Sequence, residues 1–210
     1  MKNGGMQGNR VLLLELDSLS LEFIRRHLDT LPFLRKLLAD GEIVKTESTG
    51  DIASASVWPT FSSAKLPGGH GHYFPFQWNA KKLRFYRPYK AAWNGELTYE
   101  PFWYDLAREG FSCQVLDAVQ CIPATDSPCL EIHDWSSQSS GKALTTDRTV
   151  LSRLRTTFGS RPIGAEVPVS KTLHQSNSLL DSILDSLRKK SEAITWLGQT
   201  RDWQLYLASI

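Results

Sequence analysis

Four consecutive aliphatic residues, Val11-Leu12-Leu13-Leu14, open the first apolar segment of the chain, which ends at Asp17. An unbroken apolar run of this length is typical of a strand buried on both faces, as in parallel sheets. Apolar residues at helical spacing follow over residues 21–38, with Pro32 inside the segment and Gly41 after it. We therefore expect a strand over residues 11–16, followed by one long or two short helices.

The same alternation of strands and helices continues to the end of the chain. The pattern predicts strands over residues 42–48, 111–119, 130–134 and 203–210, and helices over residues 101–109, 147–158 and 176–197. Helices that alternate with apolar strands predict a three-layer α/β/α domain around a mostly parallel sheet. Ligands bind such sheets at the carboxyl ends of strands, where this sequence places Asp17, Asp117 and His133-Asp134.

The composition fits one globular domain over residues 1–210 and excludes several classes of function. The 24 Lys and Arg residues nearly balance the 22 Asp and Glu residues, so we expect no nucleic-acid partner held by phosphate neutralisation. The apolar runs are shorter than the ~18 residues of a membrane span, and residues 1–10 do not resemble a signal peptide. We expect a cytoplasmic protein without a membrane partner, in which Cys113, Cys121 and Cys129 are reduced thiols.

Residues 76–100 combine cationic and aromatic side chains. Lys81, Lys82, Arg84, Arg87 and Lys90 alternate there with Phe85, Tyr86, Tyr89 and Trp93. Such a segment could hold an anion or a ring by ion pairing and stacking. We favour the simpler interpretation, a solvated insertion with an aromatic underside.

Two segments carry candidate catalytic groups. A carboxylate such as Asp17 after a buried strand either forms a turn or binds a metal ion. Ser54 and Ser56 precede what looks like a short helix with Pro59 in its first turn. A hydroxyl there is a candidate nucleophile, because free N–H groups at a helix start favour a phosphate, although serine is also a common N-cap.

Taken in order, four pieces of this sequence resemble the alkaline phosphatase superfamily, and most closely its type I phosphodiesterase/nucleotide pyrophosphatase group. They are Asp17 after the first strand, the helical region with Pro32-Phe33-Leu34-Arg35-Lys36-Leu37 and Gly41, the serine segment with Trp58-Pro59, and Pro67-Gly68-Gly69-His70-Gly71. Departures occur at Ser18, where the family usually has Gly, and at Ser63-Ala64, where it usually has Thr-Gly. Counting back from the last piece places the nucleophile at Ser54, whereas anchoring on Trp58-Pro59 leaves Ser56 as the nearest hydroxyl.

The resemblance implies a metal-dependent hydrolase of phosphate mono- or diesters with a phosphate-ester small molecule as substrate. In the family two divalent metals, usually zinc, flank the nucleophile, so Asp17 and Ser54 map onto metal ligands and Ser54, with Ser56 second, onto the nucleophile. The family's other ligands follow later strands, and this chain ends near the first of them. We therefore expect the N-terminal part of a truncated domain, inactive as this fragment; the alternative is a non-catalytic remnant or binding module with the same core.

Two further expectations concern neighbouring segments. If the strands over residues 11–16 and 42–48 are parallel neighbours, Asp17 lies within about 4 Å of the Ser54 or Ser56 hydroxyl, since both would share one metal. If Asp17 is a cap instead, its carboxylate faces the backbone N–H groups of Leu19 or Ser20. The strand over residues 203–210 is expected to lie at an open sheet edge and to promote self-association.

Overall fold

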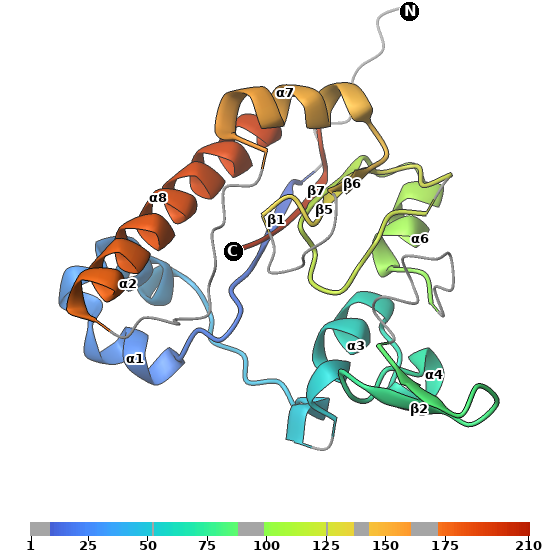
Figure 1. Ribbon diagram of the computed structural model, residues 1–210. Coiled ribbons are helices and arrows are strands. Elements are labelled where there is room, and N and C mark those ends of the chain that lie inside the picture. Colours follow the sequence, from blue (N-terminus) through green and yellow to red (C-terminus); the bar gives the residue numbers. More distant parts are fainter. Residues whose placement is uncertain (1–8, 52, 88–98, 125, 137–142, 161–171) are drawn as a thin grey trace, which may run out of the picture.

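A central five-stranded sheet organises the chain (Figure 1). The computed structural model describes residues 9–51, 53–87, 99–124, 126–136, 143–160 and 172–210. The strand order is β1-β7-β4-β5-β6, and the first four strands are mutually parallel while β6 is antiparallel to β5. The strands are β1 (Val11–Glu15), β7 (Leu205–Ser209), β4 (Cys113–Leu116), β5 (Leu130–His133) and β6 (Leu144–Thr145).

Helices cover both faces of this sheet. On one face α6 (Phe102–Arg108) buries Trp103 and Tyr104 against Val115 and Leu207. On the other, α7 (Arg148–Phe158) and α8 (Leu173–Gly198) pack Leu154 and Leu197 against a cluster that includes Leu116, Ile132 and Tyr206. Adjacent residues of a strand point to opposite faces, and β7, β4 and β5 are buried on both sides. The expectation that the first strand is buried in the same way is wrong, because β1 is mostly exposed. The predicted α/β/α architecture with a mostly parallel sheet is confirmed.

Shorter elements connect the sheet to the candidate site. Two short helices, α1 (Leu21–Arg26) and α2 (Pro32–Asp40), follow β1, and Pro32 begins the second because its missing N–H is not needed there. Next come α3 (Val57–Ser63), α4 (Pro67–His70) and a hairpin of β2 (Gln77–Asn79) and β3 (Arg84–Tyr86). The hairpin lies within the expected insertion, whose residues 88–98 fall outside the described part. None of the described helices is long and apolar enough to cross a membrane.

The predicted strand over residues 42–48 is wrong. These residues form no strand in the structure, and Val44 is 71% exposed. β1 pairs instead with β7, so the strand beside β1 comes from the other end of the chain. Apolar residues such as Ile43 and Val44 suit a strand by type, but a strand also needs a partner whose backbone groups it can bond.

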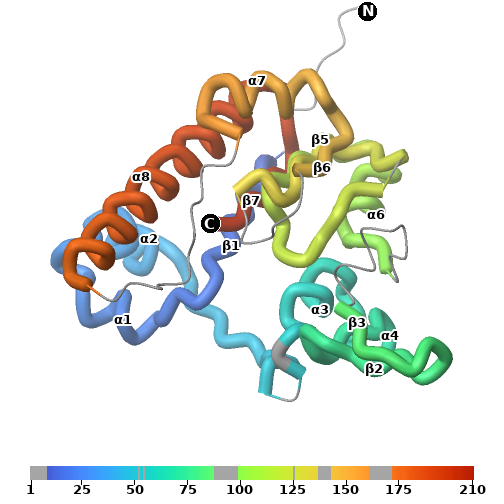
Figure 2. Tube along the Cα trace, in the orientation of Figure 1, coloured from blue at the N-terminus to red at the C-terminus, as the bar shows by residue number. Residues whose placement is uncertain are grey.

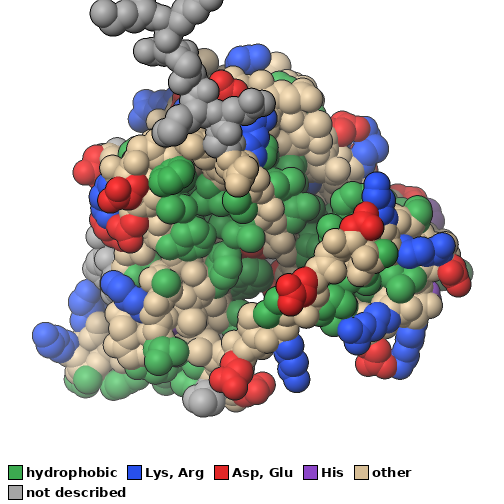
Figure 3. All heavy atoms as spheres, turned by 180° about the vertical axis from the view of Figure 1, so that it is seen from behind, with side chains coloured by type: hydrophobic (Ala, Val, Ile, Leu, Met, Phe, Trp, Pro, Cys, Tyr) green, Lys and Arg blue, Asp and Glu red, His purple; other side chains and the backbone are tan. Residues whose placement is uncertain are grey.

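The expected position of the C-terminal strand is also wrong. β7 lies between β1 and β4, pairs in parallel with both, and is buried along its whole length. Figure 2 shows the two ends of the described chain, blue and red, side by side in the sheet. The edge strands of the described sheet are β6 and β1, and in β1 Val11, Leu12 and Leu14 are each about half exposed. Viewed from behind, hydrophobic side chains gather in the middle of the surface (Figure 3).

Asp117 ties the ends of two strands together. It follows β4 with a φ of 56°, a backbone conformation that Asp tolerates better than most residues. Its carboxylate accepts hydrogen bonds from the backbone N–H groups of Trp135 (2.8 Å) and Ser136 (2.9 Å) and from the Ser136 hydroxyl (2.5 Å). The Lys190 ammonium of α8 lies 3.5 Å from the same carboxylate. Asp117 is therefore a turn former, one of the two roles expected of carboxylates at strand ends.

Replacing Asp117 tests how much this tie contributes to stability. Asp117→Ala leaves two buried N–H groups and the Lys190 ammonium without their acceptor, so we expect a loss of about 3–5 kcal/mol in the free energy of unfolding, measured by urea denaturation. Asp117→Asn is the matched control, because it keeps one acceptor and tolerates a positive φ, and it should cost less. Equal stability of the alanine variant and the unmodified chain would contradict this role.

Self-association stays a prediction, and the strand expected to carry it is now β1. An unpaired apolar edge exposes backbone groups that a second copy can bond. Leu12→Lys and Leu14→Lys place charges beside this edge and should shift the chain toward monomer in sedimentation experiments, whereas Phe33→Lys on the exposed face of α2 should not. A monodisperse monomer of the unmodified chain at high concentration would count against the prediction.

Candidate functional site

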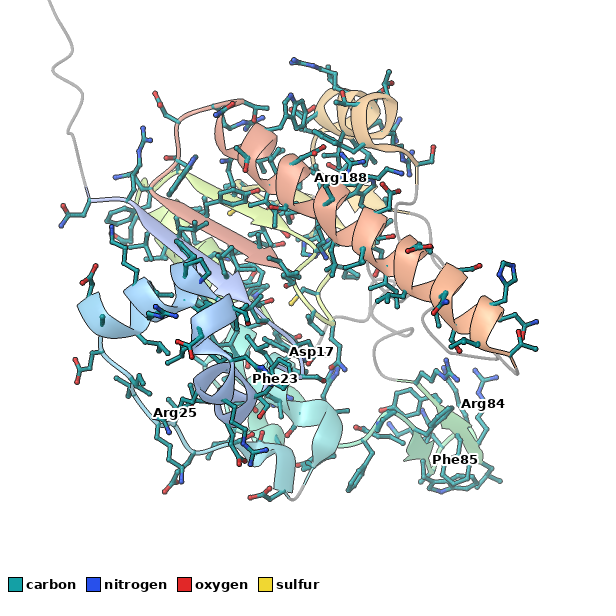
Figure 4. The ribbon with its side chains drawn as sticks, turned by 90° about the vertical axis from the view of Figure 1, so that its left-hand side faces the viewer. Asp17, Phe23, Arg25, Arg84, Phe85 and Arg188 are labelled. Carbon is teal, nitrogen blue, oxygen red and sulfur yellow. The ribbon has the colours of Figure 1, made fainter. Side chains whose placement is uncertain are left out.

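Asp17 lies just past the carboxyl end of β1 (Figure 4). It occupies a turn in which Ser18 has a φ of 59°, so serine adopts the left-handed conformation at the position where the family usually has glycine. The Asp17 side chain is exposed and makes no hydrogen bond or ion pair with any residue that the structure describes. Ser20 is the N-cap of α1, accepting a hydrogen bond from the N–H of Phe23 at 3.2 Å. Asp17 accepts no hydrogen bond from the backbone N–H groups of Leu19 or Ser20, so the capping alternative is not observed.

The serine segment forms a tight 3-10 turn (Ser54–Ser56) that runs directly into α3. The side chain of Ser54 lies outside the described residues, so the expected short distance between Asp17 and the Ser54 hydroxyl stays a prediction. The parallel-strand argument behind that expectation does not hold, because residues 42–48, which lead into the serine segment, form no strand.

Ser56 is a buried structural hydroxyl in this conformation. Its side chain has no exposed surface, and its Oγ lies 2.6 Å from the carbonyl oxygen of Ala53 and 2.6 Å from Thr49 Oγ1. A serine hydroxyl carries one proton and the Ala53 carbonyl can only accept, so Ser56 donates to Ala53 and Thr49 donates to Ser56. A hydroxyl engaged in this way closes the turn that precedes α3.

A histidine anchors the same turn through a chain of hydroxyls. His70, at the end of α4, accepts a hydrogen bond at Nδ1 from the backbone N–H of His72 at 3.0 Å. Its proton therefore sits on Nε2, which lies 3.0 Å from Thr60 Oγ1 of α3. Thr60 Oγ1 is 3.4 Å from Thr49 Oγ1, which continues to Ser56. The chain from His70 to Ser56 holds α3, α4 and the serine turn in one arrangement.

Burial keeps both histidines of this region neutral. Desolvation lowers the pKa of His70, and desolvation together with the neighbouring His70 lowers the pKa of His72 to about 4. Both rings stand edge-on to Tyr99, at centroid distances of 6.0 and 5.6 Å. Both rings pack in the interior of the protein.

Two contacts determine how α3 ends and where it lies. Its C-cap, Ala64, has a φ of 53°, the left-handed conformation that glycine adopts at lower cost and that the family usually supplies with Thr-Gly. The Ser63 hydroxyl donates to the carbonyl of Pro59 at 2.6 Å within the same helix. The Cys121 thiol, past the end of β4, donates to the hydroxyl of Ser62 at 3.3 Å and so connects α3 to the carboxyl edge of the sheet.

Burial also raises the pKa of the Cys121 thiol, to about 12. All three cysteines are buried and free, in agreement with the expectation of thiols.

A buried polar cluster at the carboxyl edge was not foreseen as a group. The Ser209 hydroxyl at the end of β7 donates to Glu15 at the end of β1, and Glu131 Oε2 lies 2.8 Å from His133 Nε2 on β5. Burial raises the pKa of Glu15. Glu15 Oε1 and His133 Nδ1 are buried without a hydrogen-bond partner in the described structure. The sequence signal for this cluster was Glu15, the single acid in the first apolar run. The other members could not be added to it, because the sequence does not show which strands are neighbours.

The described residues do not complete a metal centre. No group of three or more His, Cys, Asp and Glu side chains among them is arranged to hold a metal ion. Two catalytic zinc ions need about six protein ligands, about three for each. Asp17 is the only one of the proposed ligands whose side chain the structure describes, and it is free to bind. The expected pair of zinc ions therefore does not fit the described side chains alone.

Comparisons with known proteins identify the family. Residues 11–210 match the family model described as type I phosphodiesterase / nucleotide pyrophosphatase. Crystal structures of phosphonoacetate hydrolase from Sinorhizobium meliloti 1021, in complex with phosphonoformate and with phosphonoacetate, share the fold with a TM-score of 0.56 and 12% sequence identity. The similarity covers 96% of this chain and 46% of that one, so this chain spans about half of its structural neighbour. No curated protein sequence matches. On the family match over nearly its whole length, the chain belongs to the type I phosphodiesterase/nucleotide pyrophosphatase family.

Proposed function

We propose that this chain contributes the nucleophile and one metal ligand to a hydrolase of phosphate mono- or diesters, and that the remaining ligands come from polypeptide outside these 210 residues. Ser54 is the nucleophile: its oxygen bonds to phosphorus, the bond from phosphorus to the leaving oxygen breaks, and the serine proton passes through solvent to the leaving oxygen. Water then cleaves the phosphoserine ester and frees the phosphate. Asp17 supplies a carboxylate to a divalent metal ion, whose chemistry when bound is to stabilise charge on the phosphoryl oxygens.

The state of Asp17 is the single observation that carries this proposal. An exposed carboxylate at the carboxyl end of a parallel strand has no structural partner among the described residues, whereas Asp117 at the end of β4 accepts three hydrogen bonds. Asp17 and Asp117 thus occupy equivalent positions after parallel strands but have different roles. One holds the fold together, and the other is left available at the edge where α/β sheets bind ligands.

The hydroxyl chain supports Ser54 over Ser56 as the nucleophile. Ser56 is buried and donates to Ala53, so attack by its oxygen would require the turn before α3 to open. We assign Ser56, Thr49 and Thr60 a positioning role, in which His70 fixes the turn that carries Ser54. α3 has only seven residues, so hydrogen bonds rather than a long helix dipole hold this segment in place.

A non-catalytic remnant or binding module is the second candidate. The observation that favours it is the incomplete ligand set: of the residues mapped onto metal ligands, the described side chains include Asp17 alone, and the chain covers 46% of its structural neighbour. Both candidates share the same core, and they differ in whether the rest of a centre exists in another part of the protein.

Asp17 can be tested in the chain as it stands. If its carboxylate is held for a ligand, Asp17→Ala should change the free energy of unfolding by less than about 0.5 kcal/mol, as for other surface residues. Ser20→Ala, three residues further along the chain, removes the cap of α1 and should cost about 1 kcal/mol. A loss for Asp17→Ala as large as that for Ser20→Ala, in urea denaturation without metal, would identify Asp17 as a structural residue.

The incomplete ligand set predicts that the 210-residue chain is inert. We expect no hydrolysis of p-nitrophenyl phosphate esters and less than one tightly bound zinc per chain in equilibrium dialysis, because the described side chains supply too few ligands. If the reading frame continues, the longer protein should be active, Ser54→Ala should lower kcat by about 10³-fold or more, and Ser56→Ala should mainly lower stability. Zinc-dependent turnover of the short chain at ~1 s⁻¹ would overturn the incomplete-site argument.

A further inference from the structure

The hairpin of β2 and β3 turns its apolar side chains away from the protein. Its register pairs Trp78 directly with Phe85, and their rings contact each other edge to face at 5.2 Å. These side chains are 53% and 68% exposed, and the neighbouring Phe76 and Leu83 are 53% and 74% exposed. Figure 4 shows the hairpin at the margin of the molecule, with Phe85 and Arg84 labelled. Exposed apolar residues grouped in this way mark an interaction surface.

Polar contacts fix the opposite face of the hairpin to the protein. Gln77 accepts a hydrogen bond from the backbone N–H of Tyr73 at 2.7 Å and donates to the carbonyl of Gly71 at 2.9 Å. Its amide also lies 3.3 Å from the hydroxyl of Tyr86, its partner across the hairpin. Because side chains alternate along a strand, binding Gln77 and Tyr86 inward turns Trp78 and Phe85 outward. The usual order of a surface hairpin, polar out and apolar in, is reversed.

The charge around this surface has one sign. Between Asp51 and Glu96 the sequence contains six Lys and Arg residues and no Asp or Glu, although the whole chain has a net charge of only +2. The hairpin and its flank carry four of these cations: Lys81, Lys82, Arg84 and Arg87. Each is exposed, and none forms an ion pair with a described residue. The surface therefore favours a partner that is anionic outside and apolar beneath.

We propose that the outward apolar face of the hairpin (Phe76, Trp78, Leu83 and Phe85), flanked by the exposed Lys81, Lys82 and Arg87, docks on a membrane surface rich in anionic lipid. Trp and Phe side chains settle at the level of the headgroups, and each Lys or Arg near anionic lipid adds about 1 kcal/mol of attraction. Such peripheral contact needs no membrane-spanning segment. The expectation of no membrane partner rested on short apolar runs and on residues 1–10, and neither bears on peripheral contact through a hairpin.

The geometry of the rings favours a membrane over a single-stranded nucleic acid. Bases stack on open aromatic faces. Here Trp78 and Phe85 pack against each other edge to face, and the Arg87 guanidinium covers the Phe76 ring at 4.5 Å. The most exposed member of the group, Leu83, has no ring to stack on. Aliphatic and edge-on aromatic groups suit acyl chains, which require no face-to-face stacking.

Vesicle co-sedimentation of the 210-residue chain tests this proposal. We expect binding to vesicles of phosphatidylcholine and phosphatidylserine in equal parts, weakening as salt is added, and little binding to phosphatidylcholine alone. The double variant Trp78→Ser, Phe85→Ser should bind the anionic vesicles about 100-fold more weakly. The double variant Lys81→Gln, Lys82→Gln should bind them at least about tenfold more weakly. The matched control, Phe23→Ser with Phe33→Ser, changes two exposed rings on α1 and α2 and should bind normally.

Trp78→Phe separates insertion from misfolding. It keeps an aromatic side chain, so vesicle binding should persist, but the blue shift of tryptophan fluorescence on binding should decrease because Trp78 no longer contributes. Circular dichroism confirms that each variant is folded. Equal binding to both kinds of vesicle, unchanged binding by the Trp78 and Phe85 double variant, or hairpin-dependent binding of a single-stranded oligonucleotide in place of vesicles would each overturn the proposal.

Discussion

The parallel pairing of β7 with both β1 and β4 is the constraint on which the rest of the structure depends. Val11 pairs with Leu205, and Cys113 pairs with Leu205 from the other side. Without β7, β1 has no described partner and β4 has only β5, so the sheet divides into two parts. All five residues of β7 are buried. Leu207 packs in the core on the α6 side of the sheet, and Tyr206 packs in the core on the α7 and α8 side. Because these contacts join distant parts of the sequence, formation of the sheet should be a late and slow step in folding.

The same pairing brings chemically different residues to one edge. Parallel strands deliver their carboxyl ends together, so Glu15, Ser209, Asp117 and His133 meet at the side of the sheet that faces α3. Glu15 is turned inward, where Ser209 donates to it and burial raises its pKa. Asp17, only two residues later but past the end of the strand, is exposed and unpartnered in the described structure. One strand thus ends in a structural carboxylate and a carboxylate available for a ligand.

Sequence patterns predicted the elements of this fold better than their arrangement. Helical spacing was sufficient for α7 and α8, and Pro32 indicated the division into two short helices after β1. Strand order was not accessible, because the buried β7 and the exposed segment around Val44 are both simply apolar in sequence. Asp117 and Asp17 likewise both follow apolar runs, and only the neighbouring N–H groups of Trp135 and Ser136 distinguish a turn former from a free carboxylate.

The candidate site shows the same limit. Spacing from the glycine-flanked His70 indicated Ser54, but the hydroxyl chain that engages Ser56 depends on side-chain positions that no spacing specifies. The residues that reach Ser56 come from three separate segments: Thr49, Thr60 of α3 and His70 of α4. The physical reason to set Ser56 aside, its engagement by neighbouring groups, therefore depends on the packing of helices around it.

The two exposed apolar surfaces of this chain favour different partners for physical reasons. Along β1 the exposed Leu12 and Leu14 lie beside backbone groups without a partner strand in the described sheet. Burying such backbone groups against a surface that cannot hydrogen-bond costs free energy. That edge favours another polypeptide strand. On the β2–β3 hairpin the inner face is already satisfied through Gln77, and the outer face combines apolar tips with nearby cations that form no ion pair with a described residue. A protein strand would leave those cations uncompensated, whereas an anionic lipid surface accepts the charges and the apolar tips at once.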